Sequence, residues 1–159
     1  MDIINGTVKL AFGRHNNRLL NPPQTKKLLD SFMESGLQRY LKENAIPIVV
    51  RTSWIETGKL SQDPTDSESI PPMPWTATAL KERRLVTALG GRHRQDALLK
   101  YTAGLRKDVS RALDRMAKLG VRGSAVKEAG SEELLNAEKE VIRASQWLVV
   151  VYSKGKCLT

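Results

Sequence analysis

The chain has 159 residues, and its 26 Lys and Arg against 17 Asp and Glu give a formal net charge of +9. Hydrophobic residues make up 40% of it, which excludes a wholly disordered chain, and the length suits a single compact domain over 1–159. No apolar run approaches the roughly 20 residues of a membrane helix and the start lacks a signal-peptide pattern, so we expect an intracellular protein (cytoplasm or nucleus) with no membrane partner.

The first quarter of the chain predicts one short strand and one helix. Residues 7–12 (TVKLAF) have a strand-like pattern. Pro22 and Pro23 cannot lie in a helix interior, because they lack the amide hydrogen and restrict the residues before them. We therefore expect Thr25 to cap a helix over about 26–36.

The next segment predicts a strand followed by a long loop. A short helix over 37–43 precedes the strand IPIVVRTSWI at 46–55. The stretch 56–79 contains four prolines among Ser, Asp and Thr, and shows no periodic pattern. Such a length without structure is typical of a flexible loop or lid. Trp75, near its end, is a candidate anchor, and an aromatic side chain that packs on the surface is the alternative.

The C-terminal half predicts alternating strands and helices. A strand over 84–89 leads through two glycines into a helix over 92–101. A second helix follows over 108–119, Ser131 caps a last helix, and WLVVVY at 147–152 closes the chain as a strand. We therefore expect an α+β fold, with a small mixed sheet flanked by helices.

The positive charge is unevenly distributed along the chain. Residues 81–127 hold 13 basic and 4 acidic residues, whereas 1–80 has a net charge of +1 and 128–159 has one of −1. The whole excess therefore comes from one segment. An excess of this kind indicates an anionic partner, although a solvated basic face would give the same count.

The strongest local feature is the turn between the strand at 84–89 and the helix after it. Gly90 and Gly91 are followed at once by Arg92, His93 and Arg94. A helix N-terminus has amide hydrogens without acceptors, glycines let a ligand approach the backbone, and arginines match phosphate oxygens. The pattern indicates a phosphate site. The alternative is a tight turn with exposed charge.

The same turn carries a family resemblance. LGGRHRQDAL at 89–98 resembles the signature of the ParB/sulfiredoxin superfamily, where ParB-type proteins begin Gly-Glu-Arg-Arg and sulfiredoxins have Gly-Gly-Cys-His-Arg. Asn-Pro-Pro-Gln at 21–24 resembles the Asn-Pro-x-Gln box of ParB domains. Residues 31–50 resemble the family's helix, Gly-Leu turn and strand, and 146–152 resembles its closing strand. The match covers roughly 18–101 together with that last strand.

The resemblance implies a ParB/sulfiredoxin-like fold that binds ATP or CTP. A helical insertion at 102–145 would precede the last strand. Sulfiredoxins place a phosphate-contacting lysine at the position of Lys26 or Lys27, and Arg18 is a candidate for a similar contact. The alternative for Lys26 and Lys27 is solvent-facing charge on an amphipathic helix. The residues that the resemblance places at the phosphates of the nucleotide are Gly90, Gly91, His93 and Arg94, with Arg92 beside them.

Three departures from the family narrow the expected activity. Arg92 stands where sulfiredoxins have their nucleophilic cysteine, and Cys157 is distant in sequence, so we do not expect sulfinic-acid repair. Gly91 replaces the glutamate of ParB proteins. The residues after Tyr101 do not accommodate the helix-turn-helix module and dimerisation tail of ParB, so centromere-like DNA recognition is not expected.

The insertion carries a basic stripe of its own. Its members recur at spacings of four, four, three and four, which places them on one side of a helix: Lys107, Arg111, Arg115, Lys118 and Arg122. Such a stripe could follow the phosphate backbone of DNA or RNA. No aromatic residues lie between its members, so base stacking is not indicated. A solvated helix face is the alternative.

Three functional hypotheses remain open: a nucleotide-dependent switch, an enzyme (nucleotide hydrolase, small-molecule kinase or nuclease), and a nucleic-acid-binding module. The enzyme hypothesis needs a carboxylate near the γ-phosphate, usually with Mg²⁺. Glu34, Glu43 and Glu56 are candidates for this role, and the sequence favours none of them, so no catalytic residue is assigned. One cysteine and two histidines exclude a thiolate-rich or histidine-rich metal site, and we expect no resident metal.

Overall fold

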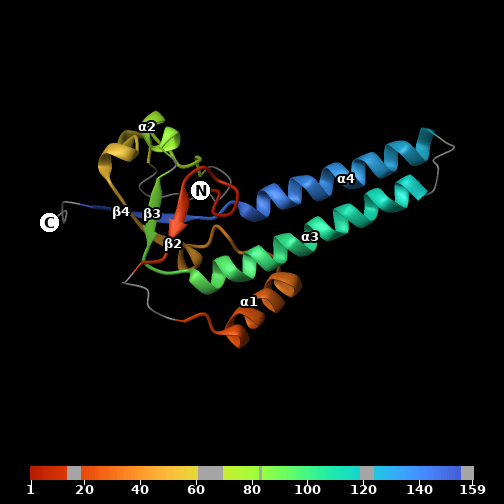
Figure 1. Ribbon diagram of the computed structural model, residues 1–159, viewed down its shortest axis with the longest axis horizontal. Helices are drawn as coiled ribbons and strands as arrows, with labels where there is room; N and C mark the ends of the chain where they lie inside the picture. Colours follow the sequence, from red (N-terminus) through yellow and green to blue (C-terminus); the bar gives the residue numbers. More distant parts are fainter. Residues whose placement is uncertain (14–18, 61–69, 83, 119–123, 155–159) are drawn as a thin grey trace.

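The computed structural model describes residues 1–13, 19–60, 70–82, 84–118 and 124–154 (Figure 1). Four strands form one mixed sheet in the order β1-β3-β2-β4: β1 Lys9–Ala11, β2 Ile46–Val50, β3 Leu85–Ala88 and β4 Val149–Ser153. β1 is parallel to β3, β3 is antiparallel to β2, and β2 is parallel to β4. The expected α+β class with a small mixed sheet is confirmed.

Within the described residues, four α-helices accompany the sheet: α1 Pro22–Ser35, α2 Ala77–Lys81, α3 Arg92–Lys118 and α4 Ser124–Ser145. Short 3-10 turns lie at Lys42–Asn44, Thr52–Trp54 and Thr57–Lys59. Figure 1 shows α3 and α4 as a long antiparallel pair that projects away from the sheet, with α1 beside the first half of α3. No helix in the described part of the chain is long and apolar enough to cross a membrane.

The core lies on one face of the sheet. Ile46, Ile48 and Val50 of β2 alternate with half-buried residues and are almost completely buried. Ala97 and Leu98 of α3 pack into the same core cluster. Because successive side chains of a strand point to opposite faces of the sheet, the remaining ones lie on the other face, where several apolar residues are exposed.

Two predictions for the N-terminal half are wrong. α1 begins at Pro22 and its N-cap is Asn21, whose Oδ1 accepts the Gln24 N–H at 3.3 Å. Both prolines fit because the first-turn N–H groups have no partner inside a helix. Thr25, the expected cap, is buried within the helix instead. The helix expected over 37–43 is reduced to the 3-10 turn Lys42–Asn44, where no amphipathic stripe sustains a longer helix.

The helical part also differs from expectation. α3 is a single helix, not two over 92–101 and 108–119, because nothing between these ranges breaks it and Gly104 is tolerated within it. α4 begins at Ser124, seven residues before the expected cap Ser131, since a helix extends easily once nucleated.

The ends of the Pro-rich segment 56–79 are fixed to the rest of the fold. Trp75 bridges to Ile55, and Glu56 N–H donates to Pro74 O at 2.9 Å, so the expected anchoring by Trp75 is confirmed. Thr76 caps α2, which begins inside the expected loop. Residues 61–69 lie outside the described residues. The strand expected over 46–55 ends at Val50, because the chain turns into the 3-10 turn Thr52–Trp54.

Candidate phosphate site

The turn after β3 has a glycine that no other residue replaces without strain. Leu89 N–H donates to Pro47 O at 2.9 Å and holds the turn against β2. Gly91 has a φ of 85°, in the left-handed region, and a Cβ there would lie 3.0 Å from Ile46 Cγ1. A Cβ on Gly90 would meet only ordinary contacts with Pro47. Gly91 is therefore the residue that shapes the turn.

The first turn of α3 has the electrostatics of an anion site. Gln95 N–H makes the first helical hydrogen bond, to Gly91 O at 2.8 Å, so helix geometry leaves the preceding amides without an acceptor inside α3. No acidic residue lies in this first turn. The nearest carboxylate along the helix, Asp96, pairs with Lys100 at 2.9 Å. The positive end of the helix dipole thus has no negative side chain in its own turn.

His93 joins this turn to the start of α1. Its Nε2 accepts the backbone N–H of Asn21 at 2.8 Å. Both helices therefore begin at the same place, as Figure 1 shows. α1 offers few amide donors there, because Pro22 and Pro23 have none and Gln24 N–H is capped by Asn21. The donors for an anion come from α3, and α1 adds its dipole.

Arg94 points into the fold rather than toward the turn. Its Nη1 donates to Asn44 O at 2.6 Å, its Nη2 donates to Asn44 Oδ1 at 3.1 Å, and the guanidinium lies 5.7 Å from the Trp147 ring centre. Burial lowers the pKa of Arg94 from its ordinary value. Trp147 Nε1 also donates to Asn44 O, at 2.8 Å. Arg94 therefore holds the loop before β2 against the start of the last strand.

The other candidate residues are distributed around this turn. Arg92 is the first residue of α3 and is half-buried. Lys26 and Lys27 are exposed in the second turn of α1, and Arg18 lies outside the described residues. Of the candidate carboxylates, Glu43 is next to the Asn44 that binds Arg94. Glu34 lies near the far end of α1 and Glu56 pairs with Lys59.

Sequence reasoning missed three residues that organise the turn. Asn21 carries a recognisable signal, because an Asn directly before prolines is typical of an N-cap. Asn44 and Trp147 carry none, because their contacts with Arg94 join segments that are far apart in the chain.

The basic stripe lies on the outer half of α3. Four of its members are exposed there: Lys107, Arg111, Arg115 and Lys118. Arg111 Nη1 contacts Asp108 Oδ1 at 3.3 Å, and Arg122 lies outside the described residues. Because α3 is continuous, Lys118 lies about 39 Å along the helix axis from Arg92. The turn and the stripe are therefore two separate regions.

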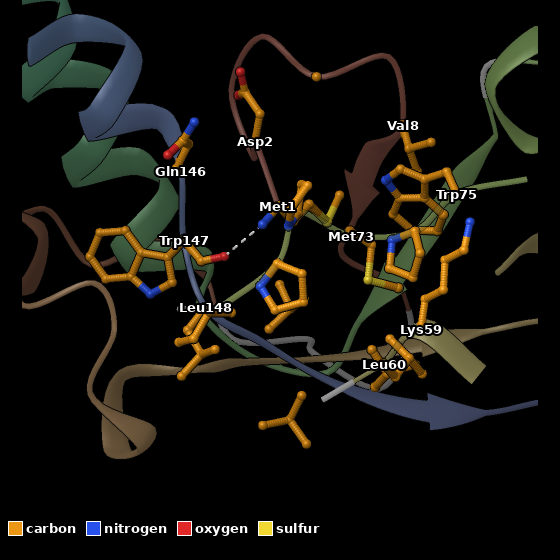
Figure 2. Close-up of a pocket in the computed structure, with 18 of the residues that line it drawn as sticks. Met1, Asp2, Val8, Lys59, Leu60, Met73, Trp75, Gln146, Trp147 and Leu148 are labelled. Carbon is orange, nitrogen blue, oxygen red and sulfur yellow. Dashed lines mark hydrogen bonds between the residues drawn. The ribbon is translucent and has the colours of Figure 1, made fainter. Parts of the chain in front are cut away.

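A cavity of about 910 Å³ lies elsewhere in the fold (Figure 2). Its walls are mainly apolar, with Met73, Trp75 and Leu148 among the side chains that surround it. Met1 lies between them, and its amino group donates to Trp147 O at 3.0 Å. None of residues 89–95 lines this cavity, and its apolar walls do not suit a phosphate.

Comparisons of the chain with protein-family models, with curated proteins and with solved structures find no match.

Proposed function

We propose that this chain binds the phosphate groups of a nucleotide, ATP or CTP, at the first turn of α3. The observation that carries the proposal is the 2.8 Å hydrogen bond from Asn21 N–H to His93 Nε2, because it brings two helix N-termini together at the Gly-Gly turn. Two adjacent positive dipole ends attract an anion. The resemblance of residues 89–98 to the ParB/sulfiredoxin signature supports the same ligand class.

Each residue of the turn has a distinct role in this proposal. Gly91 lets the backbone approach the phosphate, and the first-turn amides of α3 donate to its oxygens. The side chain of Arg92 neutralises its charge. His93 holds the start of α1 in place through Nε2, and Arg94 is a positioning residue that fixes the adjacent loop through Asn44. The proposal is for binding, as in a nucleotide-dependent switch, and assigns no hydrolytic step.

Calorimetric titration with ATP, CTP, GTP and tripolyphosphate, each with and without Mg²⁺, tests the proposal. We expect Arg92→Glu to weaken binding about tenfold or more, because it replaces a charge-assisted contact with repulsion. A thermal melt of the same variant shows whether the fold is kept, and a negative side chain at a helix start favours the helix. Loss of binding with an unchanged melting temperature would therefore not reflect loss of the fold.

The matched control is Arg115→Glu, which makes the same charge change near the other end of α3. We expect it to change nucleotide affinity less than about twofold, because the region lies well beyond the Debye length of about 8 Å at physiological salt. Absence of binding in the wild type, or an equal loss in both variants, would refute the proposal.

A second candidate function is nucleic-acid binding by the outer half of α3. The observation that favours it is the exposure of Lys107, Arg111, Arg115 and Lys118 on one uninterrupted helix. If these residues contact phosphates, Arg111→Ala/Arg115→Ala should weaken DNA or RNA binding and lower the slope of log K against log salt by about 2. An unchanged affinity and slope would remove this candidate.

A further inference from the structure

β4 forms an edge of the sheet that lacks the usual protection. Within the described residues, its only strand neighbour is β2. Its sequence, VVVYS, contains no charged residue, proline or glycine. Native proteins usually protect an exposed edge with such residues, because its unpaired backbone groups otherwise recruit another strand. The edge therefore has the properties of a pairing surface, independently of the phosphate site.

The hydrogen-bonding groups of β4 define which residues are available. Ile46 N–H donates to Leu148 O at 3.0 Å, and Lys154 N–H donates to Val50 O at 2.8 Å. In a parallel ladder, successive residues direct their backbone groups to opposite sides. The even-numbered residues of β4 therefore face β2. The residues whose N–H and C=O groups point to the open edge are Val149, Val151 and Ser153.

The fold also sets the length of this open edge. Leu148 N–H donates to Arg39 O at 3.0 Å on the side of β2, so Leu148 is held just before β4 and adds no outward-facing group to the open edge. The free part is the strand Val149–Ser153, whose central residue is Val151. We propose that β4 pairs antiparallel with β4 of a second copy of this chain, around a two-fold axis at Val151, and so extends the sheet across the dimer.

This register satisfies every outward backbone group. Val151 lies opposite Val151 of the partner subunit, and Val149 lies opposite Ser153 of the partner subunit. Both are hydrogen-bonded pairs, in which the two residues exchange N–H and C=O bonds. A symmetric dimer needs a surface that is complementary to itself, and a five-residue edge with donors and acceptors on its first, third and fifth residues meets that condition.

The side chains of the edge fit the same register. Val150 is 43% exposed and Tyr152 is 52% exposed, on the sheet face opposite the core. The register places Val150 directly across from Tyr152 of the partner subunit, as a close pair without backbone hydrogen bonds between them. Pairs of an aromatic and a β-branched residue stabilise antiparallel strands. No like charges face each other, because Lys154 falls opposite Leu148 of the partner subunit.

Sedimentation velocity over a range of concentrations tests the dimer. We expect the wild type to dimerise, and Val150→Lys to raise the dissociation constant about tenfold, because two symmetric pairs are lost. The matched control is Leu85→Lys, which changes a 63%-exposed residue of the same sheet face on the interior strand β3. It should change the constant less than about twofold. Added salt should strengthen the dimer, because it screens two chains of charge +9.

A cross-link tests the register. In a Cys157→Ser background, Val150→Cys/Tyr152→Cys should form an intermolecular disulfide on mild oxidation, because the paired Cα atoms would lie about 4.5 Å apart. Val150→Cys alone should not, since the two copies of that residue lie diagonally. A wild type that is monomeric up to about 1 mM would refute the proposal. So would a dimer that Val150→Lys leaves intact or that Leu85→Lys weakens equally.

Discussion

The two ends of α3 carry similar positive charge but differ in what surrounds it. At the start, His93 accepts from Asn21, and Arg94 donates twice to Asn44. At the far end, Arg115 is exposed and Arg111 pairs with Asp108, three residues earlier on the same helix. The charged side chains at the first end contact distant segments of the chain, whereas those at the second end have local contacts and solvent.

The cationic side chains of α3 therefore fall into two kinds, those bonded to other parts of the fold and those exposed to solvent, which a charge count does not distinguish. Hydrogen bonds from a half-buried guanidinium to a loop contribute to stability, whereas exposed pairs on a helix contribute little. A fixed turn suits one phosphate group, because its donors are held in place before the ligand arrives. An exposed stripe suits a longer polyanion, which binds through its charge density.

The largest effect is expected at Arg94. Arg94→Ala removes two hydrogen bonds to Asn44 and the contact with the Trp147 ring, so we expect a loss of about 2–4 kcal/mol in the free energy of unfolding. Arg111→Ala, at the exposed end, should cost less than about 0.5 kcal/mol. Urea denaturation measures both. Similar costs for the two variants would mean that the ends of α3 do not differ.

Two glycines of the same segment should respond in opposite directions. Gly91→Ala forces a Cβ to within 3.0 Å of Ile46 in a left-handed conformation, and should cost about 1–3 kcal/mol. Gly104→Ala lies within α3 with nothing near the new Cβ, and should stabilise the protein by about 0.5–1 kcal/mol. Denaturation midpoints measure both stability changes, provided that the m-values are unchanged. A stabilising Gly91→Ala would contradict the described turn.

A smaller effect is expected at His93. His93→Ala leaves Asn21 N–H without its acceptor, and because Asn21 is exposed to water the cost should be about 0.5–1 kcal/mol. Nucleotide affinity should fall as well, because the start of α1 is no longer held at the turn. Thermal unfolding and calorimetry measure the two effects. If affinity were unchanged, the contact would be structural only.

The smallest effect is expected at Tyr101, where α3 passes from one region to the other. Burial, and secondarily the charge of Glu140, raise the pKa of Tyr101 above its usual 10.0. The folded state thus holds this proton more tightly than the unfolded state, so its contribution to stability is full below pH 10 and is lost as the pH rises further. As the pH rises from 9 to 11, the free energy of unfolding of the Tyr101→Phe variant should fall less than that of the wild type, as measured by denaturation. An identical decline would contradict the shift.

The sequence alone predicted the strands better than the helix limits. The β-branched runs of β2 and β4 signal buried strands, because alternate residues such as Ile46 and Ile48 must face a core. The prediction of two helices in place of α3 was wrong. The apolar periodicity weakens near Gly104, although no residue there breaks a helix. The position of Asn21 as N-cap could have been recognised from the prolines that follow it.

For the candidate site, the sequence indicated the turn but not what holds it. The Gly-Gly-Arg-His-Arg pattern places charge at a helix start. The pattern does not show which way each side chain points. Arg94, which turns inward to Asn44, could therefore not be distinguished from Arg92. Contacts of this kind join residues about fifty positions apart, and such pairings depend on the tertiary fold rather than on local spacing.

The most direct test of the phosphate site is a titration of ¹⁵N-labelled protein with ATP and CTP, followed by amide chemical shifts. We expect the first and largest changes at Gly91, Arg92, His93 and Asn21, because phosphate oxygens would accept from amides there or disturb the His93 contact. Residues 107–118 should change little at physiological salt. Changes confined to 107–118, or to the walls of the apolar cavity, would contradict a phosphate site at the first turn of α3.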